Sequence, residues 1–101
     1  MELQDYRDRL DRIDDEIAAL FQRRMETVAE IAACKKANHT PVLAAGREEE
    51  ILRRVTGLVD EELREYAATL YQTLMALSRG YQTRLMAAGT GGESGGADEG
   101  G

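Results

Sequence analysis

Residues 3–36 read LQDYRDRLDRIDDEIAALFQRRMETVAEIAACKK, and this stretch has the apolar spacing of one long amphipathic helix. No proline interrupts the stretch and no glycine lies inside it. About 34 residues rising 1.5 Å each make a rod of roughly 51 Å, which a domain of this size cannot cover by itself. The apolar face consists of Leu3, Tyr6, Leu10, Ile13, Ile17, Leu20, Val28 and Ile31, widened by Phe21 and Ala32.

The composition of the chain favours an all-α fold. Ala, Leu, Glu and Arg are abundant, whereas the chain has one proline, no tryptophan and few β-branched residues. A length of 101 residues leaves room for one domain with a modest core. A partner subunit would help to complete that core.

Charge and cysteine content exclude several classes of function. The net charge of -6 makes nucleic acid or an anionic membrane an unexpected partner, so a bound anion would need a local cluster of cations. The single Cys34 excludes an internal disulfide, and one cysteine with one histidine, His39, gives no metal site. Because the N-terminus lacks a signal-peptide pattern and no apolar run could cross a membrane, we expect a cytoplasmic protein.

Two shorter helices are expected after the long one. Pro41 disfavours helix before it, so the first helix should stop near residue 37 or 38 and lead into a loop. A second helix is expected over residues 47–56, ending at Gly57, and Asp60 is expected to cap a third helix. The third helix has apolar residues at core spacing: Leu63, Tyr66, Ala67, Leu70, Tyr71, Leu74, Leu77, Tyr81 and Leu85.

A glycine-rich segment begins at about Ala88 and contains almost nothing that can be buried. We expect it to be disordered, either as a simple tail or as the stub of a linker to a second, fused or docked enzyme. The sequence therefore predicts a helical domain over residues 1–87 and a glycine-rich tail over residues 88–101.

Two long cations interrupt the apolar face of the first helix. Arg24 and Lys35 lie 11 residues apart, which places them about 20° apart around the helix axis and about 16 Å apart along it. Burying either charge without a partner is costly. Two interpretations stay open: the cations hold one compact anion between them, or they form salt bridges with acids on neighbouring helices.

Arg7 is a third cation on the same helix. It lies about 42 Å from Lys35 along the axis, so it cannot join that site within its own chain. A second copy packed antiparallel could bring it there, which would also cover the long rod. The alternative is that Arg7 is an ordinary solvated surface charge.

Four more polar residues could complete such a site. Arg47 and Glu48 open the second helix, either as an ordinary charged first turn or with Glu48 accepting a hydrogen bond from a substrate hydroxyl while Arg47 supports the site. Ser78 and Gln82 lie one turn apart on the apolar face of the third helix and would supply neutral hydrogen-bond donors.

An ordered set of short motifs therefore runs through the chain: Arg7, Leu10-x-x-Ile13-Asp14, Arg23-Arg24, Lys35, His39-x-Pro41-Val42, Arg47-Glu48 and Ser78-x-x-x-Gln82. Over about residues 3–86, this set resembles the all-helical class of chorismate mutases. The resemblance implies an intertwined homodimer of three-helix chains. It also implies an isomerase that converts chorismate to prephenate in the biosynthesis of phenylalanine and tyrosine.

The resemblance also implies roles for individual residues. Arg24, together with Arg7 of the other subunit, would bind the two carboxylates of chorismate, and Ser78 would bond one of them. Lys35 and Gln82 would donate hydrogen bonds to the ether oxygen of the breaking bond, where negative charge grows.

At the second helix, the resemblance implies that Glu48 bonds the ring hydroxyl and that Arg47 helps to order the site. The chain departs from the family pattern at Ala44, where an aspartate is common. The connection between Glu48 and Ser78 is also about two residues shorter than in the family form compared, so the turn between the second and third helices is expected to differ.

The implied reaction is a pericyclic rearrangement that requires no nucleophile, metal or cofactor. Such a site works by restraining a flexible substrate and by placing donors at the developing charge. Two alternatives remain at the level of the sequence: an isochorismate pyruvate-lyase on the same fold, and a non-catalytic helical dimer with a regulatory or docking role.

Overall fold

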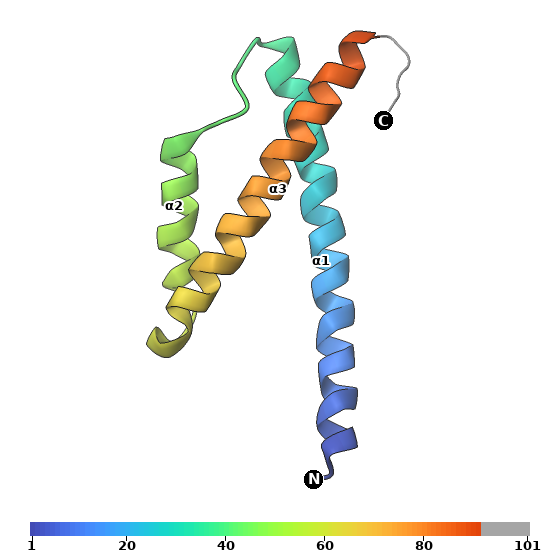
Figure 1. The fold of residues 1–101 in the computed structure, drawn as a ribbon, viewed down its shortest axis with the longest axis vertical. Coiled ribbons are helices and arrows are strands. Elements are labelled where there is room, and N and C mark those ends of the chain that lie inside the picture. Colours follow the sequence, from blue (N-terminus) through green and yellow to red (C-terminus); the bar gives the residue numbers. More distant parts are fainter. Residues whose placement is uncertain (92–101) are drawn as a thin grey trace.

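The fold is all-α, as the composition predicts. The computed structural model describes residues 1–91, and this part of the chain contains three α-helices, one 3₁₀ turn and no strand. The elements follow in the order α1 (Leu3–Ala37), α2 (Ala45–Thr56), η1 (Glu61–Leu63) and α3 (Arg64–Gly91). Figure 1 shows α3 crossing α1 near the C-terminal half of α1, with α2 alongside α3.

Helix α1 has the extent that its apolar spacing predicts. At its start, the backbone N–H of Glu2 donates to Asp5 Oδ2 at 3.0 Å, which satisfies a donor that the helix itself leaves unpaired. The helix ends at Ala37, where Asn38 follows as C-cap and His39 adopts the left-handed conformation with φ of 55°. The described chain is 55 Å in its longest dimension because α1 is a nearly isolated rod over its N-terminal half (Figure 1).

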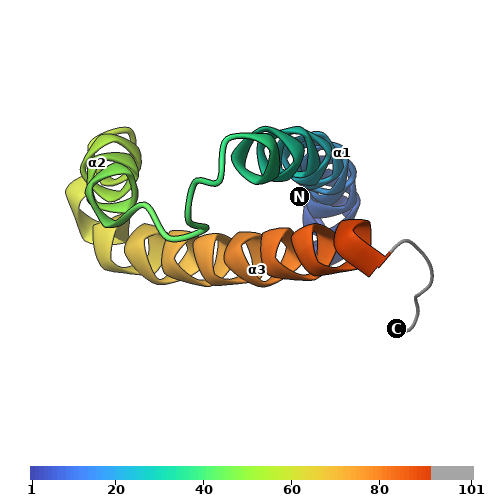
Figure 2. The same cartoon turned by 90° about the horizontal axis from the view of Figure 1, so that it is seen from above.

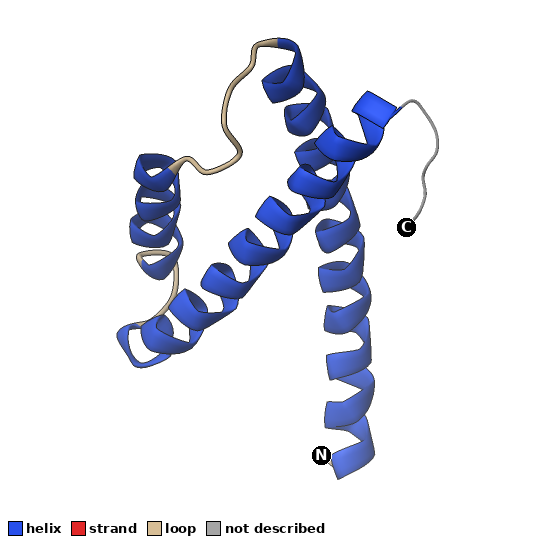
Figure 3. Cartoon of the chain, turned by 45° about the horizontal axis from the view of Figure 1, so that its top comes forward, coloured by secondary structure: helices blue, strands red, loops and turns tan. Residues whose placement is uncertain are grey.

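Helix α2 begins two residues earlier than predicted and ends as predicted. It starts at Ala45 rather than Arg47, because Ala45 is a strong helix former and the N–H of Glu48 already bonds the carbonyl of Ala44 at 3.0 Å. Gly57 follows its last residue. The loop that joins α1 to α2 is shown in Figure 3.

The third helix differs from its prediction at both ends. Asp60 does precede the helical segment, but its side chain makes no capping hydrogen bond and the first turn is the 3₁₀ turn η1, so the α-helix itself starts at Arg64. Helix α3 then continues to Gly91, so the first residues of the predicted tail are helical. The rest of that tail, residues 92–101, lies outside the described part of the chain.

The core of the single chain is small. Both α1 and α2 pack on α3, and Figure 2 shows them on the same side of it. The buried apolar side chains are Val28, Ala32, Val55 and Met75, and two polar residues, Ser78 and Gln82, are buried with them. The core therefore lies around the middle of α3, where it meets the C-terminal half of α1.

Most of the predicted apolar face of α1 is exposed. Only Val28 and Ala32 of that face are buried. The N-terminal part of the face lies beyond the reach of α3, and Ile31 lines the pocket described below. The exposed large apolar residues of α1 are Leu3, Tyr6, Leu10, Ile13, Ile17, Leu20, Phe21 and Ile31, and those of η1 and α3 are Leu63, Tyr66, Leu70 and Leu77. Among the described residues, no helix is both long and apolar enough to cross a membrane.

Candidate active site

A pocket of about 540 Å³ lies where the three helices meet. It is open to solvent on one side and is walled by the C-terminal half of α1, the start of α2, the middle of α3 and the loop before α2. Its lining residues are Leu20, Arg23, Arg24, Thr27, Val28, Ile31, Lys35, Val42, Ala44, Arg47, Glu48, Ile51, Met75, Ser78, Arg79 and Gln82.

The pocket is strongly cationic although the chain is acidic overall. Five arginine or lysine side chains and one carboxylate line it, in a chain whose net charge is -6. The apolar walls beside them lower the local dielectric constant and strengthen the field of these charges. The pocket thus supplies the local cation cluster that an anion would need.

Arg24 is oriented by Ser78. Its Nη1 donates to Ser78 Oγ at 2.6 Å, and that hydroxyl in turn donates to the carbonyl of Leu74 at 2.8 Å. Ser78 is only 5% exposed, so its hydroxyl is a fixed acceptor for the guanidinium. Four of the five N–H donors of Arg24 are left for other partners.

Lys35 is oriented by the loop that follows α1. Its Nζ donates to the carbonyl of Val42 at 2.6 Å. Neither Lys35 nor Arg24 forms an ion pair with any carboxylate in the described part of the chain. Of the two interpretations that the sequence left open for these cations, internal salt bridging is thus not observed among residues 1–91.

Gln82 brings an unsatisfied amide oxygen to the pocket. It is 7% exposed, and its buried Oε1 has no hydrogen-bond partner among the described residues. Ser78 lies one turn before it on α3, so the two polar residues share one line as predicted. Because an unpaired buried acceptor is costly, a group that donates a hydrogen bond to this oxygen would remove a penalty.

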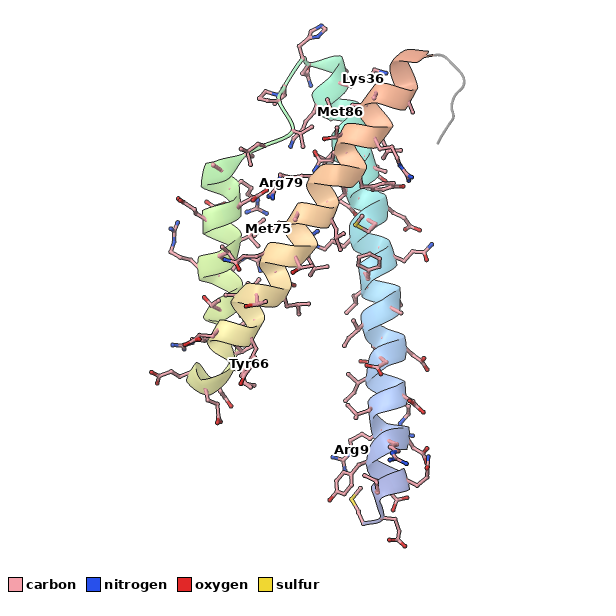
Figure 4. The ribbon with its side chains drawn as sticks, in the orientation of Figure 1. Arg9, Lys36, Tyr66, Met75, Arg79 and Met86 are labelled. Carbon is pink, nitrogen blue, oxygen red and sulfur yellow. The ribbon has the colours of Figure 1, made fainter. Side chains whose placement is uncertain are left out.

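Glu48 is held by a residue that the sequence reasoning missed. Its Oε1 accepts a short hydrogen bond from Nη1 of Arg79, and this pair joins α2 to α3. Figure 4 shows Arg79 on the side of α3 that faces α2. Arg79 lies off the apolar line of α3, so the helical spacing did not indicate a role for it. Its position directly after Ser78 is the only feature of the sequence that could have indicated one.

Arg47 is at the rim of the pocket. Its Nη1 pairs with Glu50 at 2.8 Å, and the two side chains are 59% and 62% exposed. Such an exposed pair one turn apart on a helix orders its neighbours weakly. Ala44 lines the pocket beside it, at the position where the family pattern often has an aspartate.

Arg7 is the one predicted site residue that is far from the pocket. It is exposed on the N-terminal half of α1, in the part of the rod that α3 does not reach. Figure 4 places its neighbour Arg9 near the free end of the helix, well away from Arg79. Within one chain, the structure therefore brings together Arg24, Lys35, Glu48, Ser78 and Gln82, with Arg47 at the edge.

The fold and the pocket define a class: a small all-helical protein with a cationic pocket. Residues 6–83 match the model of the family chorismate mutase type II, and the chain belongs to this family. Searches among curated proteins and among solved structures gave no match.

Membership in this family confirms the resemblance that the motifs carry. The activity of the chain is that of an isomerase, the conversion of chorismate to prephenate on the route to aromatic amino acids. Nothing in the family match favours the pyruvate-lyase or the non-catalytic alternative.

Proposed function

We propose that the pocket binds chorismate as a dianion and that Arg24 and Lys35 are its principal cationic contacts. The observation that supports this proposal is the bonding of these two side chains. Each donates only to a neutral oxygen, Ser78 Oγ or the Val42 carbonyl, so each is oriented without being neutralised. A protein that used these charges for its own stability would instead pair them with carboxylates.

The proposed mechanism needs restraint and electrostatics rather than a nucleophile. The rearrangement moves electron density onto the ether oxygen as its bond to the ring breaks. In the proposal, Lys35 and the amide of Gln82 donate to that oxygen. A preorganised donor of this kind is worth about 2.7 to 4 kcal/mol of barrier. Arg24, oriented by the Ser78 hydroxyl, holds one carboxylate of the substrate, so that the flexible arm stays over the ring.

The remaining contacts of the proposal lie on α2 and its preceding loop. Glu48 accepts a hydrogen bond from the ring hydroxyl, and its position in the pocket wall supports this role. The backbone at Ala44 is adjacent, and Arg47 contributes from the rim, where its own partner is Glu50.

The second substrate carboxylate is assigned to Arg7 of the partner subunit in a homodimer. The exposed apolar row on α1 supports this dimer. Leu10, Ile13 and Ile17 are still 56%, 44% and 57% exposed, and full burial of a completely exposed side chain of this size is worth about 1.5 to 3 kcal/mol. An antiparallel α1 from a second copy would cover this row and carry its Arg7 toward the pocket. A cytoplasmic location and a second enzyme attached through the glycine-rich tail remain predictions.

The proposal is tested by following chorismate loss and prephenate formation with the purified chain and with Lys35→Ala. We expect kcat/KM to fall by about two orders of magnitude or more, as for loss of one preorganised donor. The matched control is Lys36→Ala, which removes the next lysine of α1, a residue outside the pocket lining. Equal effects of the two substitutions, or no effect of either, would overturn the assignment of Lys35.

A further inference from the structure

The Glu48–Arg79 pair is the one ion pair between helices in the described part of the chain. Glu48 is 23% exposed and Arg79 35%, and both side chains line the pocket. The other pair, Arg47–Glu50, lies within one helix and is far more exposed. Charge-assisted hydrogen bonds are the strongest kind, and one that is partly shielded from water fixes both partners.

Glu48 is the only carboxylate that lines the pocket, and without Arg79 it would lose its partner while four cations remained around it. Two of these cations, Arg24 and Lys35, have only neutral partners in the structure. A glutamate side chain released into that pocket would be drawn to them, because opposite charges attract strongly between low-dielectric walls. Such a rearrangement would neutralise the groups that the substrate carboxylates need.

We infer that Arg79 is a positioning residue that holds Glu48 at the α2 wall and so keeps Arg24 and Lys35 available for an anionic ligand. This inference rests on the proposed function for its substrate. Arg79 acts through Glu48: it keeps the carboxylate where the ring hydroxyl meets it and away from the cations that bind the substrate carboxylates.

The test combines kinetics with direct binding of a simple dianion. The variants are Arg79→Gln, Arg79→Lys, Glu48→Gln and the double variant Glu48→Gln/Arg79→Gln. Arg54→Gln is the matched control, since Arg54 is exposed on α2 and outside the pocket. Calorimetry with cyclohexane-1,3-dicarboxylate measures dianion affinity without any need for turnover, and thermal unfolding checks that each variant is folded.

We expect Arg79→Gln to raise KM for chorismate and Kd for the dicarboxylate by roughly tenfold, with kcat changed less than about threefold. Arg79→Lys keeps the charge and should retain most of the affinity. The decisive result is that Glu48→Gln improves dicarboxylate binding much more in the Arg79→Gln background than in the unaltered protein, because only a Glu48 carboxylate released by loss of Arg79 competes for Arg24 and Lys35.

A merely structural role for Arg79 predicts that Glu48→Gln changes dicarboxylate binding by the same factor in both backgrounds. The inference is overturned if the double variant binds the dicarboxylate as poorly as Arg79→Gln, or if Arg79→Gln behaves like Arg54→Gln. Failure of the proposed function is distinguishable, because it would show as absent prephenate formation by the unaltered protein while the dicarboxylate measurements still decide the role of Arg79.

Discussion

Ser78 illustrates how one small side chain can set the direction of a cation. Its hydroxyl uses both of its capacities: it donates to the carbonyl of Leu74 one turn earlier and accepts from Arg24. Because the proton of the hydroxyl is committed to the helix backbone, a lone pair is left facing the guanidinium. Arg24 thereby has a fixed position before any ligand arrives, which lowers the entropic cost of binding.

Removing that hydroxyl should weaken substrate binding more than it weakens the fold. We expect Ser78→Ala to lower kcat/KM about tenfold, mainly through KM, because Arg24 loses its orienting acceptor. Thr73→Ala is the control, since Thr73 makes the same bond to a carbonyl one turn earlier, at 3.1 Å, on the exposed surface of α3. Steady-state kinetics of both variants would check this, and equal losses would contradict it.

Gln82 should make the reaction insensitive to pH near neutrality, because an amide has no proton to lose there. The unaltered protein is expected to keep its rate between about pH 5 and about pH 8, whereas Gln82→Glu should donate only when protonated and so lose activity as pH rises. Gln72→Glu, at an exposed position of α3, is the control. A rate for the unaltered protein that collapses across this range would refute the assignment.

The two halves of α1 have different roles. Its C-terminal half packs on α3 and supplies Arg24 and Lys35 to the pocket. Its N-terminal half leaves a continuous apolar row exposed, together with Arg7. Isolated helices gain little stability from helix propensity alone. We therefore expect the exposed apolar row of α1 to pack against a partner surface.

A charge in the middle of that row should therefore prevent association. We expect Ile13→Lys to convert a dimer into monomers with little prephenate formation, because a buried lysine without a partner is costly. The control is Asp15→Lys, which puts the same side chain on the opposite face of α1. Sedimentation velocity measures the outcome. If the unaltered protein were a fully active monomer, the proposed homodimer would be wrong.

For the whole molecule, the central question is whether each site draws on two chains. Mixed dimers of an Arg7→Ala chain and a Lys35→Ala chain would contain one intact site and one doubly altered site if Arg7 acts across the interface. Co-refolding the two inactive variants should then restore about a quarter of the unaltered activity, since about half of randomly paired dimers are mixed.

The same mixing experiment can also contradict a shared site. If Arg7 acts within its own chain, or does not act at all, mixing the variants gives no more activity than their average. The control is to mix two samples of the same variant, which cannot complement each other under either arrangement.

Much of the helical layout could be predicted because it depends on neighbours in the chain. The extent of α1 follows from an apolar spacing of three and four without proline or glycine, and the end of α2 follows from Gly57. The errors occurred at boundaries: α2 starts at Ala45, η1 precedes α3, and α3 continues to Gly91. These ends depend on weak local preferences that differ by fractions of a kcal/mol.

Local periodicity thus fixes which residues share a face, and the motifs placed six residues at or near a common site. Only the folded arrangement could decide the partners: Arg24 with Ser78, Lys35 with the Val42 carbonyl, and Glu48 with Arg79 rather than with either cation. The physical reason is distance along the chain. The first and third of these contacts join side chains 54 and 31 residues apart, and no local pattern records how the helices cross to bring them together.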